Sequence, residues 1–141
     1  MKMKILFAAL LTAFVTAFVP AGALAADPTA AVTADLAKLT SDVKTAHDGL
    51  LADVNAITAD AGKGDKAAVK TDITKLRTDV GPLRADRKQL RTDLKAAKDA
   101  GVDPTTLKPL VKAARQQNQA VLQDVWQAAK AAHQALKSLR H

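Results

Sequence analysis

Apolar residues recur at alternating intervals of three and four in three stretches of the chain, the spacing of helices that pack along a seam. In the first stretch these positions are Val32, Leu36, Leu39, Val43, Ala46, Leu50 and Ile57. In the second they are Val69, Ile73, Leu76, Val80, Leu83, Arg87, Leu90, Leu94 and Ala97, of which Arg87 alone is polar. The third stretch is wider: Leu107, Leu110, Val111, Ala114, Val121, Leu122, Val125, Ala129, Ala132, Leu136 and Leu139. The pattern predicts helices over about residues 28–61, 65–100 and 105–139.

Glycine-containing segments separate the three predicted helices. Gly62-Lys63-Gly64 ends the first helix, and Asp65 is placed to cap the second. Gly101-Val102-Asp103-Pro104 ends the second helix, and Thr105 or Thr106 is placed to cap the third. Loops this short join neighbouring helices that run in opposite directions. The sequence therefore predicts an all-α fold, an elongated antiparallel three-helix bundle or coiled-coil-like rod.

Gly81-Pro82 lies in the middle of the second predicted helix. Proline inside a helix removes a backbone hydrogen bond and costs about 3 kcal/mol. Either one kinked helix or two short helices would accommodate it. The seven-residue phase is the same on both sides of Pro82, and a loop rarely preserves that phase. The sequence therefore favours one helix with a kink at Gly81-Pro82.

Residues 63–97 repeat a seven-residue unit, as KGDKAAV, KTDITKL, RTDVGPL, RADRKQL and RTDLKAA. Asp recurs at 65, 72, 79, 86 and 93, and a cation follows each Asp five positions later, at Lys70, Arg77, Arg84, Arg91 and Lys98. Acids and cations thus occupy opposite flanks of the seam. Two arrangements fit: a parallel homodimer in which Asp72 of one copy meets Arg77 of the other, or one bundle whose own helices cover the flanks. The short loops favour the second.

The first 25 residues have the features of a cleaved secretory signal peptide. Lys2 and Lys4 precede an apolar stretch, and Ala23-Leu24-Ala25 predicts cleavage before Ala26. The apolar stretch, residues 5–19, is shorter than the about 20 residues that a membrane span needs. We therefore expect an exported protein, periplasmic or secreted, with one helical domain at residues 26–141 and no stable transmembrane segment after cleavage.

Composition and charge indicate which residues form the core beyond the predicted signal peptide and which partners the surface favours. Beyond the predicted signal peptide it has no Cys, Met, Tyr, Phe or Glu, so Leu, Val, Ile and Ala must form its core. Residues 27–61 carry six Asp and two Lys, whereas residues 63–100 carry eleven cations and six Asp. Residues 101–141 add six cations and two Asp. An acidic helix beside two basic segments indicates pairing within the chain, and the surplus of cations favours acidic partners.

Two features are candidates for contact with a partner. The first is a cluster of cations on the second helix, which is either an anion-binding surface or an ordinary solvated face: Arg77, Arg84, Arg87, Lys88 and Arg91. The second is Trp126, which either closes the edge of the bundle or contacts a partner. Asn118, like Arg87, falls on a seam, where a polar residue fixes the register of packing.

The sequence lacks the patterns of an enzyme or a metalloprotein. His47, His133 and His141 are scattered, and no serine or threonine stands in a recognisable set with a base. We therefore expect a non-enzymatic protein without catalytic residues, metal or cofactor, which binds an anionic polymer or lipid surface of the cell envelope or exterior. An intracellular nucleic-acid partner is not expected. One alternative is amphipathic binding to a lipid surface, or chaperone-like binding, in which the bundle opens and presents its apolar stripes. The other is a structural, self-associating coiled-coil rod, which would be a homo-oligomer.

Overall fold

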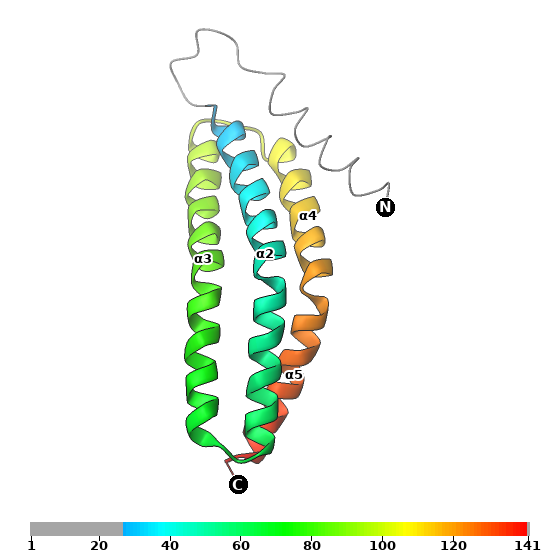
Figure 1. The fold of residues 1–141 in the computed structure, drawn as a ribbon. Helices are drawn as coiled ribbons and strands as arrows, with labels where there is room; N and C mark the ends of the chain where they lie inside the picture. Colours follow the sequence, from blue (N-terminus) through cyan, green and yellow to red (C-terminus); the bar gives the residue numbers. More distant parts are fainter. Residues whose placement is uncertain (1–26, 141) are drawn as a thin grey trace.

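The computed structural model describes residues 27–140, which form four helices (Figure 1). They are α2 (Pro28–Gly62), α3 (Lys66–Asp99), α4 (Pro104–Val121) and α5 (Gln123–Ser138). The all-α prediction is confirmed for these residues, among which there is no strand. The predicted signal peptide, residues 1–25, lies outside the described residues.

Aspartate caps begin the first three helices. The carboxylate of Asp27 accepts a hydrogen bond from the amide of Thr29 at 2.9 Å, and that of Asp65 accepts from Ala67 and Ala68. Asp103 accepts from the amide of Thr105 at 2.8 Å, so this aspartate caps α4 and the predicted cap at Thr105 or Thr106 is wrong. Each carboxylate satisfies backbone N–H groups that have no partner within the first helical turn.

Left-handed glycines end α2 and α3. Gly64 has φ of 76° and Gly101 has φ of 82°, a backbone conformation that glycine adopts without a steric penalty. After Gly101, the amide of Val102 donates to the carbonyl of Ala97 at 3.0 Å, which closes the helix end. The two turns that the glycines predicted in the sequence are therefore present.

Helix α3 continues through Gly81 and Pro82 without interruption. This confirms one long helix in preference to two short ones, whereas the kink at this point stays a prediction. Pro82 itself is exposed. The carbonyls near it therefore have access to water, which reduces the cost of the missing backbone hydrogen bond.

The third predicted helix is wrong in one respect, because it is divided into α4 and α5 at Leu122. Leu122 has ψ of 7°, far from the value of about −42° in an α-helix. Its amide still donates to the carbonyl of Asn118 at 3.0 Å, so the break is confined to one residue. The chain changes direction at this point (Figure 1). The predicted three-helix count therefore fails, and coiled-coil packing of the seams stays a prediction.

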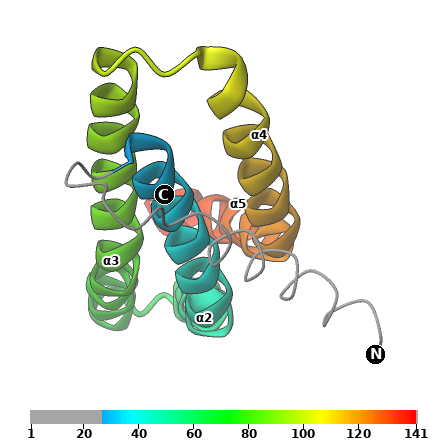
Figure 2. The same cartoon turned by 90° about the horizontal axis from the view of Figure 1, so that it is seen from above.

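Helix α2 is the central element of the fold. It packs against α3, α4 and α5, whereas α3 makes almost no contact with α4 or α5. Seen from above, α3 and α4 lie on either side of α2 (Figure 2). The core falls into two clusters. One contains Val32, Leu36, Leu39, Val43, Leu50, Leu83, Leu90, Ala97, Leu107 and Leu122. The other contains Val54, Ile57 and Ala132.

Candidate anion-binding surface

The aspartates of the seven-residue repeat in α3 face α2, where each meets another aspartate. In antiparallel order, Asp93, Asp86, Asp79 and Asp72 of α3 lie beside Asp35, Asp42, Asp53 and Asp60 of α2. Pairs of carboxylates repel each other unless a cation or a proton stands between them. The interface between α2 and α3 therefore depends on how these charges are neutralised.

Two lysines neutralise the central pairs. The ammonium of Lys38 bonds to Asp42 at 2.7 Å and also to Asp86, so it joins the two helices. The ammonium of Lys75 bonds to Asp79 at 3.0 Å and to Asp53, whose side chain is only 5% exposed. These lysines hold the pKa values of Asp42 and Asp79 below the usual range.

The outer pairs are neutralised less completely. Burial, followed by the neighbouring carboxyl of Asp93, raises the pKa of Asp35. Burial and the charge of Asp60 likewise raise the pKa of Asp72. One buried carboxylate oxygen of Asp35 and one of Asp72 has no hydrogen-bond partner among residues 27–140. These groups gain from protonation in the folded state.

The predicted intramolecular use of the Asp flank is confirmed. The Arg–Asp rungs that the parallel homodimer would have are not needed for it, because Lys38 bonds to Asp86 and Lys75 bonds to Asp53. A signal was present in the sequence, because the seven-residue Asp spacing of α3 recurs in α2 at Asp35 and Asp42 and again at Asp53 and Asp60. Since α2 covers the Asp flank, α3 does not present both of its flanks to a second copy.

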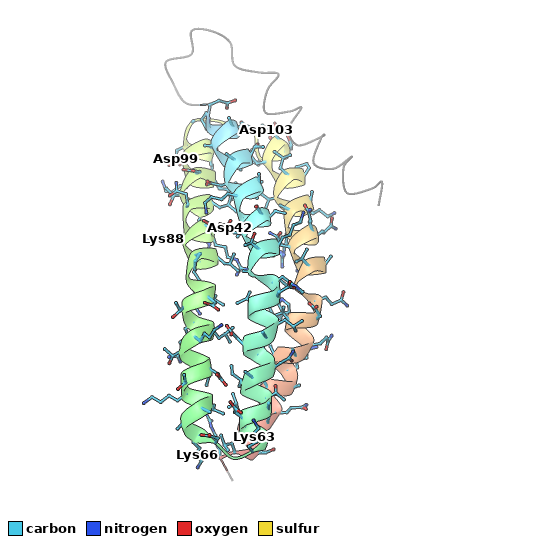
Figure 3. The ribbon with its side chains drawn as sticks, in the orientation of Figure 1. Asp42, Lys63, Lys66, Lys88, Asp99 and Asp103 are labelled. Carbon is cyan, nitrogen blue, oxygen red and sulfur yellow. The ribbon has the colours of Figure 1, made fainter. Side chains whose placement is uncertain are left out.

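The cations of the same repeat lie on the other flank of α3. All five predicted anion-binding residues are exposed, namely Arg77, Arg84, Arg87, Lys88 and Arg91. Lys88 extends from the side of α3 that is remote from α2 (Figure 3). No side chain in the described part of the chain forms an ion pair with any of the five. The structure therefore brings them together as one uncompensated cationic row.

Arg87 departs from its predicted place on the apolar seam. The positions one turn to either side, Leu83 and Leu90, are buried, but Arg87 is exposed. Leu83 and Leu90 pack in the core cluster built on α2. The predicted role of Arg87 in fixing a buried register is wrong, and this residue belongs to the cationic row.

Trp126, the other candidate for contact with a partner, is exposed, whereas Asn118, the other polar residue predicted on a seam, is half-buried. Trp126 is 62% exposed, so it does not close the edge of the packed helices. Asn118 is half-buried on the inner side of α4, and its side-chain oxygen is buried without a partner among the described residues. Trp126 is thus available to a partner, and Asn118 is a polar residue within the packing, as its seam position predicted.

His47 joins α2 to the start of α5. Its Nε2 lies 2.9 Å from Oδ1 of Asp124, and its Nδ1 lies 2.7 Å from Oδ1 of Asp48. The carboxylate of Asp124, and then that of Asp48, raises the pKa of His47. Asp124 is two residues beyond the break at Leu122, so the histidine fixes the new direction of the chain. Sequence spacing gave no indication of this contact.

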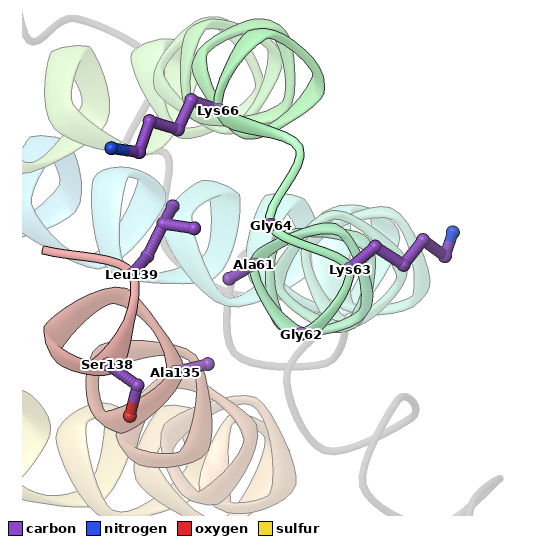
Figure 4. A pocket seen from close by; sticks show the side chains of 8 residues that line it. All are labelled: Ala61, Gly62, Lys63, Gly64, Lys66, Ala135, Ser138 and Leu139. Carbon is purple, nitrogen blue, oxygen red and sulfur yellow. The ribbon is translucent and has the colours of Figure 1, made fainter. Parts of the chain in front are cut away.

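A depression of about 630 Å³ lies between the α2–α3 turn and the end of α5 (Figure 4). Its lining includes Ala61, Ala135 and Leu139, while Lys63 extends away from it (Figure 4). Lys66 and Ser138 are the only side chains in the lining, besides Lys63, that carry a functional group. Among residues 27–140 no group of three His or Asp side chains is arranged to hold a metal ion.

Comparison of the chain with protein-family models, with curated proteins and with solved structures gave no match. None of the helices in residues 27–140 has the length and apolar character to cross a membrane.

Proposed function

We propose that this protein is an exported binding protein that holds an anionic polymer or surface of the cell envelope or exterior on the outer flank of α3. The observation that carries the proposal is the separation of charge within one repeat. The aspartates of α3 are used inside the molecule, whereas five cations of the same repeat are left exposed without carboxylate partners, namely Arg77, Arg84, Arg87, Lys88 and Arg91. In this proposal the protein acts by binding and carries out no reaction.

The spacing of the cations suits an extended ligand. Lys70, Arg77, Arg84, Arg91 and Lys98 follow one another at intervals of seven residues. An interval of seven residues corresponds to about 10 Å along a helix, so the row extends for about 40 Å. A small anion would contact one or two of these five side chains, whereas a polymer or a surface would contact all five.

The density of the cations in the middle of the row also supports anion binding. Arg84 and Lys88 stand four residues apart, as do Arg87 and Arg91. Like charges at this spacing destabilise a helix by about 0.2–0.5 kcal/mol per pair. A bound polyanion would remove this repulsion and would release counterions, so binding would weaken steeply as salt rises.

The test is a titration of fluorescein-labelled dextran sulfate with the protein at several salt concentrations, with neutral dextran as the control. We expect binding to dextran sulfate alone, with an affinity that falls linearly on a logarithmic plot against salt. Arg84→Gln should reduce the slope of that plot by about one. The matched control is Lys44→Gln, which removes one exposed charge from α2 and should leave the slope unchanged. Salt-independent binding, or equal effects of both variants, would contradict the proposal.

A further inference from the structure

A second cationic row runs along α4 and α5. Its members recur at helical spacing, they are all exposed, and the row includes no aspartate: Lys108, Lys112, Arg115, Gln119, Trp126, Lys130, His133, Lys137 and Arg140. None of the six Lys and Arg side chains in this row forms an ion pair within residues 27–140. Like the cations on the outer flank of α3, the cations of this row therefore have no carboxylate partners among the described residues.

Trp126 stands in the middle of this second row. It is 62% exposed, and it is the only aromatic residue among residues 27–140. In this row Trp126 is followed by Lys130, four residues later, and preceded by Gln119, seven residues earlier. Most of this indole is therefore open to solvent at the centre of a cationic row. An indole combines an apolar body with one N–H donor, which suits the headgroup level of a lipid bilayer.

Both rows point away from α2. On α3, Asp86 bonds to Lys38 of α2, and Arg84 stands two positions before it, about 160° round the helix. On α5, Asp124 bonds to His47 of α2, and Trp126 stands two positions after it, again about 160° round the helix. Because α3 and α4 lie on either side of α2, the two rows share the broad side of the molecule that is remote from α2 (Figure 2).

The opposite side of the molecule is formed by α2. Residues 27–61, which include α2, have six Asp and two Lys. Four of these six Asp face α3 and are used in that interface, so α2 presents little net charge to solvent. The molecule therefore has a cationic side formed by α3, α4 and α5, and no comparable excess of cations on the side formed by α2. Such an asymmetry orients a protein on a negatively charged plane, with the cationic side towards it.

We infer that the anionic partner is a lipid bilayer, on which the folded protein lies with both cationic rows against the headgroups and Trp126 among them. This inference rests on the proposed function, since it uses the same outer flank of α3 and adds the row of α4 and α5. A linear polymer would contact one row at a time. Two rows on one broad side, with a tryptophan in one of them, match a plane.

The test uses the full chain with vesicles of phosphatidylcholine alone and with vesicles that also contain phosphatidylglycerol. The chain has one tryptophan, so fluorescence reports on Trp126 and on no other site. We expect its emission to shift to the blue, and lipids with a quencher near the headgroup to quench it, only with the anionic vesicles. Lys130→Gln combined with Lys137→Gln should weaken binding about tenfold or more. The matched control, Lys44→Gln with Lys63→Gln on the other side of the molecule, should bind as the parent does.

The outcomes separate this inference from the proposed function. Binding of dextran sulfate without a shift of Trp126 on anionic vesicles would overturn the lipid inference and leave the proposed function in place. Failure with both ligands would overturn both. An equal shift on vesicles of phosphatidylcholine alone would overturn the lipid inference, because the charge of the rows would then have no part in binding.

Discussion

His47 is the residue whose protonation most directly affects how the helices are held together. Its ring lies between the carboxylates of Asp48 and Asp124, and the charges of these groups favour the imidazolium. The folded-state pKa of His47 is therefore above 6.5, its ordinary value. The contact contributes its full stability below pH 6.5, and this contribution is lost as the pH rises through the folded-state pKa.

We expect the free energy of unfolding of the parent protein to fall as the pH rises above 6.5, and His47→Gln to remove most of that dependence. Urea denaturation at several pH values, monitored by circular dichroism, measures the free energy of unfolding of both proteins. His133→Gln is the control, because His133 is exposed on α5 and should leave the pH profile unchanged. A profile that is identical in the parent and in the His47 variant would contradict the assignment.

Asp35 and Asp42, one repeat apart on α2, should respond in opposite directions to loss of charge. Burial and Asp93 raise the pKa of Asp35, so its ionised form is disfavoured in the fold at neutral pH. Lys38 lowers the pKa of Asp42, so its ionised form is favoured. Asp35→Asn should therefore raise the free energy of unfolding at pH 7, and Asp42→Asn should lower it.

The effect at Asp42 should be lost as the pH falls from 3.8, the ordinary pKa, through the lower pKa of the folded state. The effect at Asp35 should decline as the pH falls through its raised folded-state pKa and should vanish below 3.8, where the carboxyl is neutral in both states. Urea denaturation at pH 7 and in acid measures both effects. A loss of stability in both variants at pH 7 would show that the Asp35–Asp93 contact is favourable rather than repulsive.

At the scale of the elements, the ends of the helices depend on glycine and their interiors do not. Gly101 has φ of 82°, whereas Gly49 lies inside α2 with open space around the position of a Cβ. Gly101→Ala should lower the free energy of unfolding by about 1–2 kcal/mol, because a left-handed conformation strains an L-residue. Gly49→Ala should raise it by about 0.5–1 kcal/mol, because alanine is the better helix former. Thermal denaturation of the two variants tests both signs.

The elements also show which parts of the structure a sequence pattern can predict. The spacing of apolar residues and the glycine breaks give α2 and α3 to within a residue or two at each end. The break at Leu122 was missed because neither glycine nor proline stands there, and a change of one ψ angle is enough to make it. Periodicity on one helix carries no information about such a local change.

The candidate site was predicted only in part, for a related reason. The repeat shows that Asp and Lys or Arg occupy opposite flanks of α3, and the exposed cations follow from this. It does not show which flank meets α2. Arg87 was placed on a seam because its spacing fits, but its exposure depends on how α3 packs against the other helices. The exposure of Trp126 and the contact of His47 with Asp124 likewise depend on tertiary packing.

At the scale of the whole molecule, α2 connects the two core clusters. Leu83 belongs to one cluster and Ile57 to the other, while Leu76 and Val125 pack against both. The clusters should therefore unfold together. Leu83→Ala and Ile57→Ala should each lower the free energy of unfolding by about 2–5 kcal/mol in a single transition.

Leu110→Ala is the control for these core variants, because this leucine is 38% exposed and its loss should cost markedly less. Circular dichroism during urea denaturation, with limited proteolysis as a second probe, measures the effect. Two separate transitions, or a variant that melts only one end of the molecule, would show that the clusters are independent.

The exposure of Trp126 has a consequence for how the protein withstands oxidants. Oxidants attack protein sulfur readily, and residues 27–140 contain neither cysteine nor methionine. The core consists of Val, Leu, Ile and Ala, whose side chains resist peroxide. The most readily oxidised side chain in this part of the chain is an indole on the surface. Oxidation would therefore abolish the contact that Trp126 makes with a partner, while the helices remain folded.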